Sequence, residues 1–284
     1  MIRKEYQAEE LQKLQNISVL ILKELDRVCK ELDIPYFLYS GTAIGALRHK
    51  GFIPWDDDID IGLFREDYER LLAEAPAILG DDFEFVNGRT NPFFPACNSN
   101  LSLKGTLCVP EEFDNCPFQY PIGIGLFAFD KISANPHTRK KQLRGTWLWA
   151  RLSFLRSTSE PYITFNGLKR TIVLYACKVV YSFLNLFHIS PKYMHEQWEK
   201  AALMAKDEEV DLYVDFTDKD PLSWSATKAE VFPLRSIQFE DMLAPLPNKY
   251  DDMLRRSYGD YMKLPPVEDR KNHYPSKLDF GKFK

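Results

Sequence analysis

The chain has 284 residues, of which 45% are hydrophobic and 27% charged, a balance that supports one large domain or one domain with an added segment. Its net charge of −4 gives no global signature of nucleic-acid binding. The N-terminus "MIRKEYQAEELQK" lacks the apolar core of a signal peptide, and the five cysteines show no paired spacing. We therefore expect a reduced, cytoplasmic protein.

The first third of the chain predicts alternating helices and strands. Apolar residues recur at steps of three and four between Leu11 and Leu32, which predicts a long helix that stops at Pro35. A strand is expected at 36–40, followed by a glycine turn and a short helix in "GTAIGALRHKG", and a further helix at 65–79. This order is typical of an α/β or α+β unit.

The remaining elements form a mixed set. Strands are predicted at 83–87, 100–103, 122–129, 212–215 and 236–240, and a helix at 248–258. Helical spacing dominates from about 137 to 206. We predict one domain, 1–284, that carries this mainly helical stretch as an insertion.

The stretch "GFIPWDDDIDIGL" places four aspartates within five positions: Asp56, Asp57, Asp58 and Asp60. Like-charged carboxylates in one site destabilise a protein unless something positive lies among them. Because side chains alternate along a strand, Asp58 and Asp60 would share one face, with Ile59 and Ile61 on the other. Two such carboxylates suit Mg²⁺ or Mn²⁺. An isolated Asp-x-Asp is otherwise more often an acidic turn in solvent.

The residues just before the aspartates supply phosphate-binding chemistry. "YSGTAIGALRHKG" offers a Ser-Gly-Thr turn at a helix start, whose free N–H groups can hold a phosphate. Arg48, His49 and Lys50 follow shortly before the acids. A glycine turn, a basic helix end and a paired-aspartate strand in this order indicate a site for a nucleotide-diphosphate donor.

At this point "FLYSGTAIGALRHKGFIPWDDDIDIGLFREDYERL" resembles the signature of the LicD family, which includes fukutin and the fukutin-related protein. "PLPNKYDDMLRRSYGDYMKLPP" and "RKNH" resemble the closing block of that family, so the resemblance covers about 36–80 and 230–275. It implies an α+β, nucleotidyltransferase-like fold with a mixed sheet flanked by helices. It also implies metal-dependent transfer of a phospho-alcohol, phosphocholine from CDP-choline foremost, to a sugar hydroxyl of a cell-surface glycan.

The resemblance assigns roles to individual residues. Asp58 and Asp60 would be the catalytic, metal-binding pair, with Asp56 and Asp57 as candidates for an outer shell or a second Mg²⁺ or Mn²⁺. The donor phosphates would be held by Ser40, Gly41, Thr42, Arg48 and Lys50, with His49 and His273 as accessory contacts.

One position departs from the family pattern. Many members carry a third aspartate on a later strand, and in "PIGIGLFAFD" Gly125 stands in its place, whereas Asp130 falls on the opposite face. Either another acid substitutes (Asp56, Asp57, Glu112 or Asp114), or one metal suffices, or catalysis is lost. Two alternatives stay open. One is a nucleotide-sugar glycosyltransferase, since Asp-x-Asp also binds Mn²⁺–UDP in such enzymes, although the Gly-Thr turn argues against it. The other is a degenerate nucleotide-binding or scaffold protein, which Gly125 suggests.

The middle of the chain is basic and aromatic. Residues 137–178 carry nine Lys or Arg against one acid, Glu160, and the apolar run 171–187 is too short and too polar to predict a membrane span. These helices either cover the sheet with their charges in solvent, or rest at 137–187 on anionic lipid or a lipid-linked glycan acceptor at the inner face of the membrane. No nucleic-acid module accompanies the charge.

Overall fold

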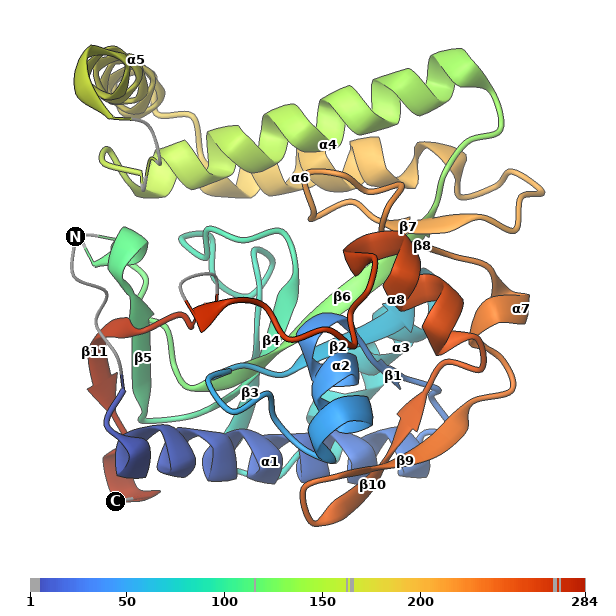
Figure 1. Cartoon of the computed structure of the whole chain (residues 1–284). Helices are drawn as coiled ribbons and strands as arrows, with labels where there is room; N and C mark the ends of the chain where they lie inside the picture. The colour runs from blue at the N-terminus through green and yellow to red at the C-terminus, as the bar shows by residue number, and fades with distance from the viewer. Residues whose placement is uncertain are drawn as a thin grey trace.

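The computed structural model describes residues 6–114, 116–161, 163, 166–267, 270 and 272–283, with only the backbone of Glu112. A mixed sheet lies between a long N-terminal helix and a layer of later helices (Figure 1). This arrangement confirms the predicted α+β class.

The main sheet has β6 (Gly123–Lys131) at its centre. Its order is β1 (Phe37–Leu38), β2 (Asp60–Phe64), β6, β4 (Ser99–Leu103) and β3 (Phe83–Val86), and β6 also pairs with β7 (Tyr213–Asp215), which pairs with β8 (Ser225–Ala226). Strands β2 and β6 run parallel, and the other pairs among the described strands are antiparallel. The predicted strands at 83–87, 100–103, 122–129 and 212–215 are confirmed.

Helix α1 (Ala8–Glu31) runs along one sheet face, as its spacing predicts (Figure 1). It forms one core with α3 (Arg65–Glu74) and the apolar side of β2, namely Ile59, Ile61 and Leu63. The opposite face holds an aromatic core of Phe37, Tyr39, Phe64, Phe129 and Tyr213, against which Met253 of α8 (Tyr250–Tyr258) packs. The polar side of β2 therefore faces the aromatic core.

Helix α2 (Ser40–His49) begins earlier than predicted. Strand β1 covers only two residues of the expected 36–40, and Ser40 turns the chain with a left-handed φ of 53°. The predicted glycine turn is therefore wrong in detail, because Gly41 already belongs to the helix. Lys50, with a φ of 61°, ends the helix.

The helical stretch predicted at 137–206 is confirmed as α4 (Pro136–Ser157), α5 (Gly167–Leu186) and α6 (Pro191–Ala202). Helices α4 and α6 pack on one another over the end of the sheet, and α5 stands at the edge of the molecule (Figure 1). Among the described residues, no single helix is long and apolar enough to cross a membrane; only α5 and the stretch 191–205 together reach that length, with a bend of 107°.

The last part of the chain returns to the sheet. It contains α7 (Lys228–Val231), a hairpin of β9 (Arg235–Phe239) and β10 (Met242–Leu246), α8, and β11 (Pro275–Asp279), which pairs with β5 (Leu107–Pro110). The strand and helix predicted at 236–240 and 248–258 are confirmed, whereas β5, β8, β10, β11 and α7 were not predicted.

Candidate active site

The four aspartates of "WDDDID" (Asp56, Asp57, Asp58 and Asp60), here called the acidic cluster, lie where the loop after α2 enters β2. Strand β2 begins at Asp60, but the carbonyl of Ile59 already accepts a hydrogen bond from the N–H of Gly125 (2.8 Å). Ile59 and Ile61 are fully buried on the α1 side. Asp58 and Asp60 therefore lie on the other face, as the alternation predicts.

Asp57 differs from its neighbours because the protein itself satisfies its carboxylate. It accepts hydrogen bonds from the Tyr6 hydroxyl (2.6 Å) and from the backbone N–H of His273 (3.0 Å), and its side chain is 3% exposed. Burial tends to raise the pKa of Asp57, but the hydrogen bonds from His273 and Tyr6 outweigh it and lower the pKa. Asp57 thus ties the two ends of the chain to the site.

His273 brings a positive charge into the acidic cluster. Its Nδ1 lies 3.3 Å from Asp57 Oδ1 and 3.4 Å from Asp58 Oδ2. The hydrogen bond to Asp57 and the charges of the nearby aspartates raise the pKa of His273 to about 10, against the effect of burial. The imidazole is therefore protonated at neutral pH and offsets part of the repulsion among the aspartates.

The other carboxyl groups of the cluster hold protons unusually tightly. Burial, followed by the charges of Asp58 and Asp57, raises the pKa of Asp56 to about 8. Burial and the same kind of repulsion raise the pKa of Asp60 well above its ordinary value. Carboxylates crowded in this way are stabilised in their charged form by an added cation.

Mg²⁺ or Mn²⁺ at this site would take its oxygen ligands from the acidic cluster. Within the described ranges, no three His, Cys, Asp or Glu side chains form a ready metal cage. Mg²⁺, however, is usually held by one or two carboxylates and completed by substrate phosphates. Asp58 and Asp60 supply two carboxylates on one face, and the side chain of Asp58 is 43% exposed, so the pair fits a cation that arrives with a phosphorylated donor.

The start of α2 is joined to the cluster by hydrogen bonds. Buried Thr42 accepts a hydrogen bond at Oγ1 from the backbone N–H of Asp60 (2.8 Å). The Ser40 hydroxyl lies 2.7 Å from that of Tyr258, and a Cβ placed on Gly41 would lie 3.1 Å from Asp56 Oδ2. Of the predicted phosphate-binding residues, Gly41 and Thr42 therefore border the acidic cluster, and Thr42 also fixes the backbone of Asp60.

The basic residues predicted as donor contacts lie at the C-terminal end of α2, the end opposite Ser40. Arg48 donates to the carbonyl of Tyr261 (2.9 Å) and to His49 (3.1 Å), whereas Lys50 is exposed and reaches no carboxylate in the described structure. Burial and the nearby guanidinium of Arg270 lower the pKa of Arg48. Arg270, which sequence reasoning missed, stacks on Trp55 with its guanidinium carbon 4.5 Å from the ring centre.

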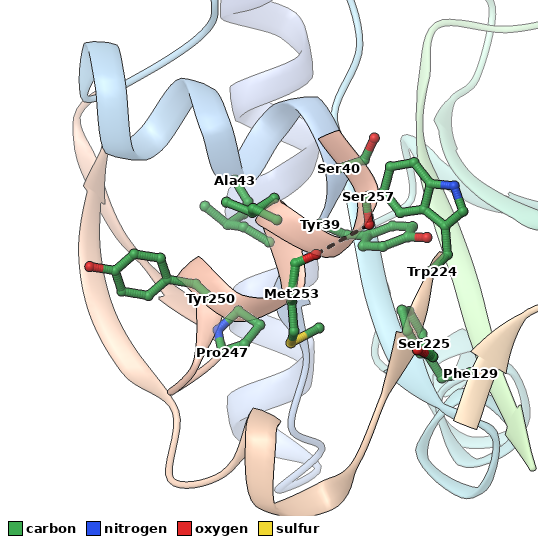
Figure 2. A pocket seen from close by; sticks show the side chains of 12 residues that line it. Tyr39, Ser40, Ala43, Phe129, Trp224, Ser225, Pro247, Tyr250, Met253 and Ser257 are labelled. Atoms are coloured by element: carbon green, nitrogen blue, oxygen red, sulfur yellow. Dashed lines mark hydrogen bonds between the residues drawn. The ribbon is translucent and has the colours of Figure 1, made fainter. Parts of the chain in front are cut away.

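An aromatic wall stands on the other side of Ser40. Tyr39 lies 5.7 Å from Phe127 and 5.2 Å from Trp224, and Trp224 lies 5.2 Å from Tyr258, between ring centres. Figure 2 shows Tyr39, Ser40 and Trp224 along the edge of a small cavity. Its volume of about 20 Å³ leaves room for a water molecule but not for a nucleotide, so the donor must bind on the open side of these residues.

A buried acid that the sequence did not single out lies behind this wall. Asp215 on β7 accepts hydrogen bonds from Tyr39 (3.3 Å) and Thr217 (2.6 Å). Burial raises the pKa of Asp215 to about 6, and the negative charge of Asp215 helps to raise the pKa of Asp60. Asp215 is thus a distant electrostatic neighbour of the cluster, and no alternation marked it, because β7 is short and buried throughout.

Gly125 stands directly beside Asp60. The two residues are paired in the β2–β6 register, and a Cβ on Gly125 would lie 3.1 Å from Asp60 Oδ1 and 2.7 Å from the ring of Phe127. A third carboxylate at this position would reach the cluster, but the Phe127 ring occupies that space.

Asp130, expected on the opposite strand face, and the acids considered as substitutes for this third carboxylate are placed differently. Asp130 forms a two-pronged ion pair with Arg65 (2.6 and 2.7 Å), and Asp114 contacts Lys277 (3.1 Å). The side chain of Glu112 lies outside the described residues. Since Asp57 is satisfied by the protein, Asp56 remains as the candidate that borders Asp58 and Asp60.

Comparison with known proteins points to one family. The sequence model of the LicD/FKTN/FKRP nucleotidyltransferase domain matches residues 33–94, which include α2 and the acidic cluster. The lipopolysaccharide cholinephosphotransferase LicD of Haemophilus influenzae is 26% identical over 93% of this chain and 96% of its own length.

Shorter matches connect the same region to animal proteins. The ribitol-5-phosphate transferase FKTN of Mus musculus is 39% identical over 17% of this chain, and the human ribitol 5-phosphate transferase FKRP is 36% identical over 21%. These matches cover only 11% and 12% of the two relatives.

Proposed function

We propose that the chain, which is similar to the LicD family of phosphotransferases, transfers phosphocholine from CDP-choline to a sugar hydroxyl of a cell-surface glycan. The observation that carries the proposal is the acidic cluster beside the start of α2, with cationic side chains at its border. Phosphocholine is favoured over ribitol phosphate because the cholinephosphotransferase matches along nearly its whole length.

The aromatic wall gives independent support for choline. A quaternary ammonium group is attracted to the faces of aromatic rings. Trp224 contacts the rings of both Tyr39 and Tyr258 beside Ser40, where the alcohol end of a donor would extend if its phosphates lay at the start of α2. A polyol such as ribitol would gain less from such a wall.

In this mechanism the chain first positions the donor. The diphosphate would lie at the positive N-terminal end of α2, and Asp58 and Asp60 would hold Mg²⁺ or Mn²⁺. When bound, the metal ion neutralises charge on the transferring phosphoryl group and on the leaving phosphate. The imidazole of His273 lies beside Asp58, with Nδ1 3.4 Å from Oδ2, and can orient that carboxylate.

The transfer itself is an in-line displacement. The oxygen of the sugar hydroxyl forms a bond to the distal phosphorus, the bond from that phosphorus to the CMP phosphate breaks, and CMP leaves with the electron pair. The hydroxyl proton passes to a carboxylate oxygen of the cluster. Asp56 is the residue we propose for this step, because Asp57 is engaged by Tyr6 and His273.

The test is CMP release from CDP-choline, CDP-ethanolamine, CDP-glycerol and CDP-ribitol with Mg²⁺ or Mn²⁺, in the presence of cell-envelope glycan. Asp58→Asn/Asp60→Asn should lower CMP release by about 10²-fold or more. Asp207→Asn, at an exposed site, is the matched control and should leave it unchanged.

Each other outcome corrects the proposal in a specific way. Release from CDP-ribitol or CDP-glycerol alone would replace choline as the transferred alcohol. Release of UDP from UDP-glucose or UDP-galactose, run alongside, would make the chain a glycosyltransferase. Binding of every donor without release would make Gly125 the mark of a protein that has lost its chemistry.

A further inference from the structure

Helix α5 exposes a continuous apolar stripe. Six large apolar side chains lie along it, each more than half exposed: Leu168, Ile172, Tyr175, Val179, Phe183 and Leu186. Their spacing of three and four residues puts them on one side of the helix. Of the described residues of α5, Leu184 is the one that is buried, and it lies on the side opposite the stripe. Soluble surfaces rarely leave such a patch uncovered.

The stripe is placed where a large partner can reach it. In Figure 1, α5 is seen nearly end-on at the edge of the molecule, beyond the end of α4 and away from the sheet. From Leu168 to Leu186 the stripe extends for about 27 Å, at 1.5 Å per residue. An extended surface can therefore approach it without meeting the acidic cluster first.

The charged residues of α4 and α5 themselves all have one sign. Helices α4 and α5 carry nine Lys or Arg and no Asp or Glu, although the whole chain has a net charge of −4. Lys169 and Lys178 flank the stripe on its two sides, since they lie about 100° of helical turn from its middle. Lys178 pairs with exposed Glu160 (2.8 Å) across a mostly solvated contact.

A second copy of the chain fits this surface poorly. The stripe offers roughly 300 Å² per copy, taking a helix about 10 Å wide, well under the ~800 Å² per partner of a standard interface. A two-fold pairing would also bring the basic flanks of both copies together. An anionic lipid surface suits both the apolar stripe and its basic flanks. It accepts apolar side chains among its acyl chains and attracts the lysines to its headgroups.

We propose that α5 lies on an anionic phospholipid bilayer, with the stripe turned toward the acyl chains and Lys169 and Lys178 extended toward the headgroups. This narrows the 137–187 surface expected from the sequence to one face of one helix. The contact is separate from the acidic cluster, so it stands or falls independently of the transferred alcohol.

The experiment is co-sedimentation of the full chain with vesicles of phosphatidylcholine alone or of equal parts phosphatidylcholine and phosphatidylglycerol. The wild type should bind the anionic vesicles, and bind them less at high salt. Ile172→Glu/Val179→Glu should lower the bound fraction at least about tenfold, because it places charge in the middle of the stripe. Leu243→Glu on β10, where the leucine is 61% exposed, is the matched control and should bind as the wild type does.

Three results would overturn the proposal. One is wild-type protein that stays in solution with anionic vesicles, and another is a double variant that binds them as well as the wild type. The third is light scattering that shows a dimer which the double variant dissociates, because the stripe would then be an interface between copies. Far-UV circular dichroism of each variant ensures that only folded proteins are compared.

Discussion

Replacing Thr42 with valine tests whether its hydroxyl group holds Asp60 in place. Valine keeps the shape of threonine but removes the oxygen that accepts the N–H of Asp60 at 2.8 Å. The N–H then stays buried without a partner at the first residue of β2, beside Gly125. We therefore expect Thr42→Val to affect both stability and the position of Asp60.

The size of both effects follows from the geometry. An unsatisfied buried N–H costs ~1–3 kcal/mol, which for a chain of this length lowers the midpoint of thermal unfolding by about 4 °C. A shift of Asp60 by a fraction of an ångström should lower kcat by roughly 10- to 100-fold, since misplacement by 1 Å can cost about 10²-fold. Thr42→Ser keeps the hydroxyl and should remain near wild type in both measurements.

The assay pairs thermal unfolding, followed by circular dichroism, with CMP release at saturating CDP-choline. Thr42→Val that unfolds and turns over like the wild type would refute the reasoning, because the hydrogen bond would then hold nothing in place. Thr42→Ser that loses as much as Thr42→Val would also refute it, since the methyl group rather than the hydroxyl would be responsible.

Three further predictions concern the surroundings of the site. Arg65→Met should lower the free energy of unfolding in urea by ~3–5 kcal/mol, because it leaves the carboxylate of Asp130 buried without its partner. Arg65→Met/Asp130→Leu should recover most of that loss, and no recovery would contradict the ion-pair explanation. The raised pKa of His273 stabilises the fold fully below pH 6.5 and progressively less up to about pH 10. The free energy of unfolding should therefore fall more steeply over that pH range in the wild type than in His273→Gln. Equal slopes would contradict this role of His273. Gly125→Ala should cost ~1–3 kcal/mol by forcing the Phe127 ring aside, and Gly125→Ala/Phe127→Leu should regain stability in the same denaturation assay.

The parts of the structure that depend on local spacing could be predicted. The apolar side chains of α1 repeat every three or four residues, and Ile59 and Ile61 alternate with Asp58 and Asp60, so the helix and the orientation of the aspartates follow from short stretches of sequence. The short strands were missed for the same reason, because two residues such as those of β8 carry no period.

Long-range pairing lay beyond such reasoning. Asp57 and Asp58 are adjacent and chemically identical, yet only Asp57 meets Tyr6, 51 residues before it, and the backbone of His273, 216 residues after it. The sequence shows that a cation is needed among the aspartates, but the partner depends on how the chain end folds back. The turn at the start of α2 was also not predictable in detail, because Ser40 adopts the left-handed φ where a turn at Gly41 was expected.

The distance along the chain between Asp57 and His273 also sets an order of events during synthesis. A ribosome adds roughly 5–20 residues per second, so the 216 residues that separate the pair take about 10–40 s to make. Throughout that interval the nascent chain carries the acidic cluster without its imidazolium. The aspartates must then stay partly protonated, bind cations from solution or remain unfolded, and the site gains its imidazole only once His273 has been made.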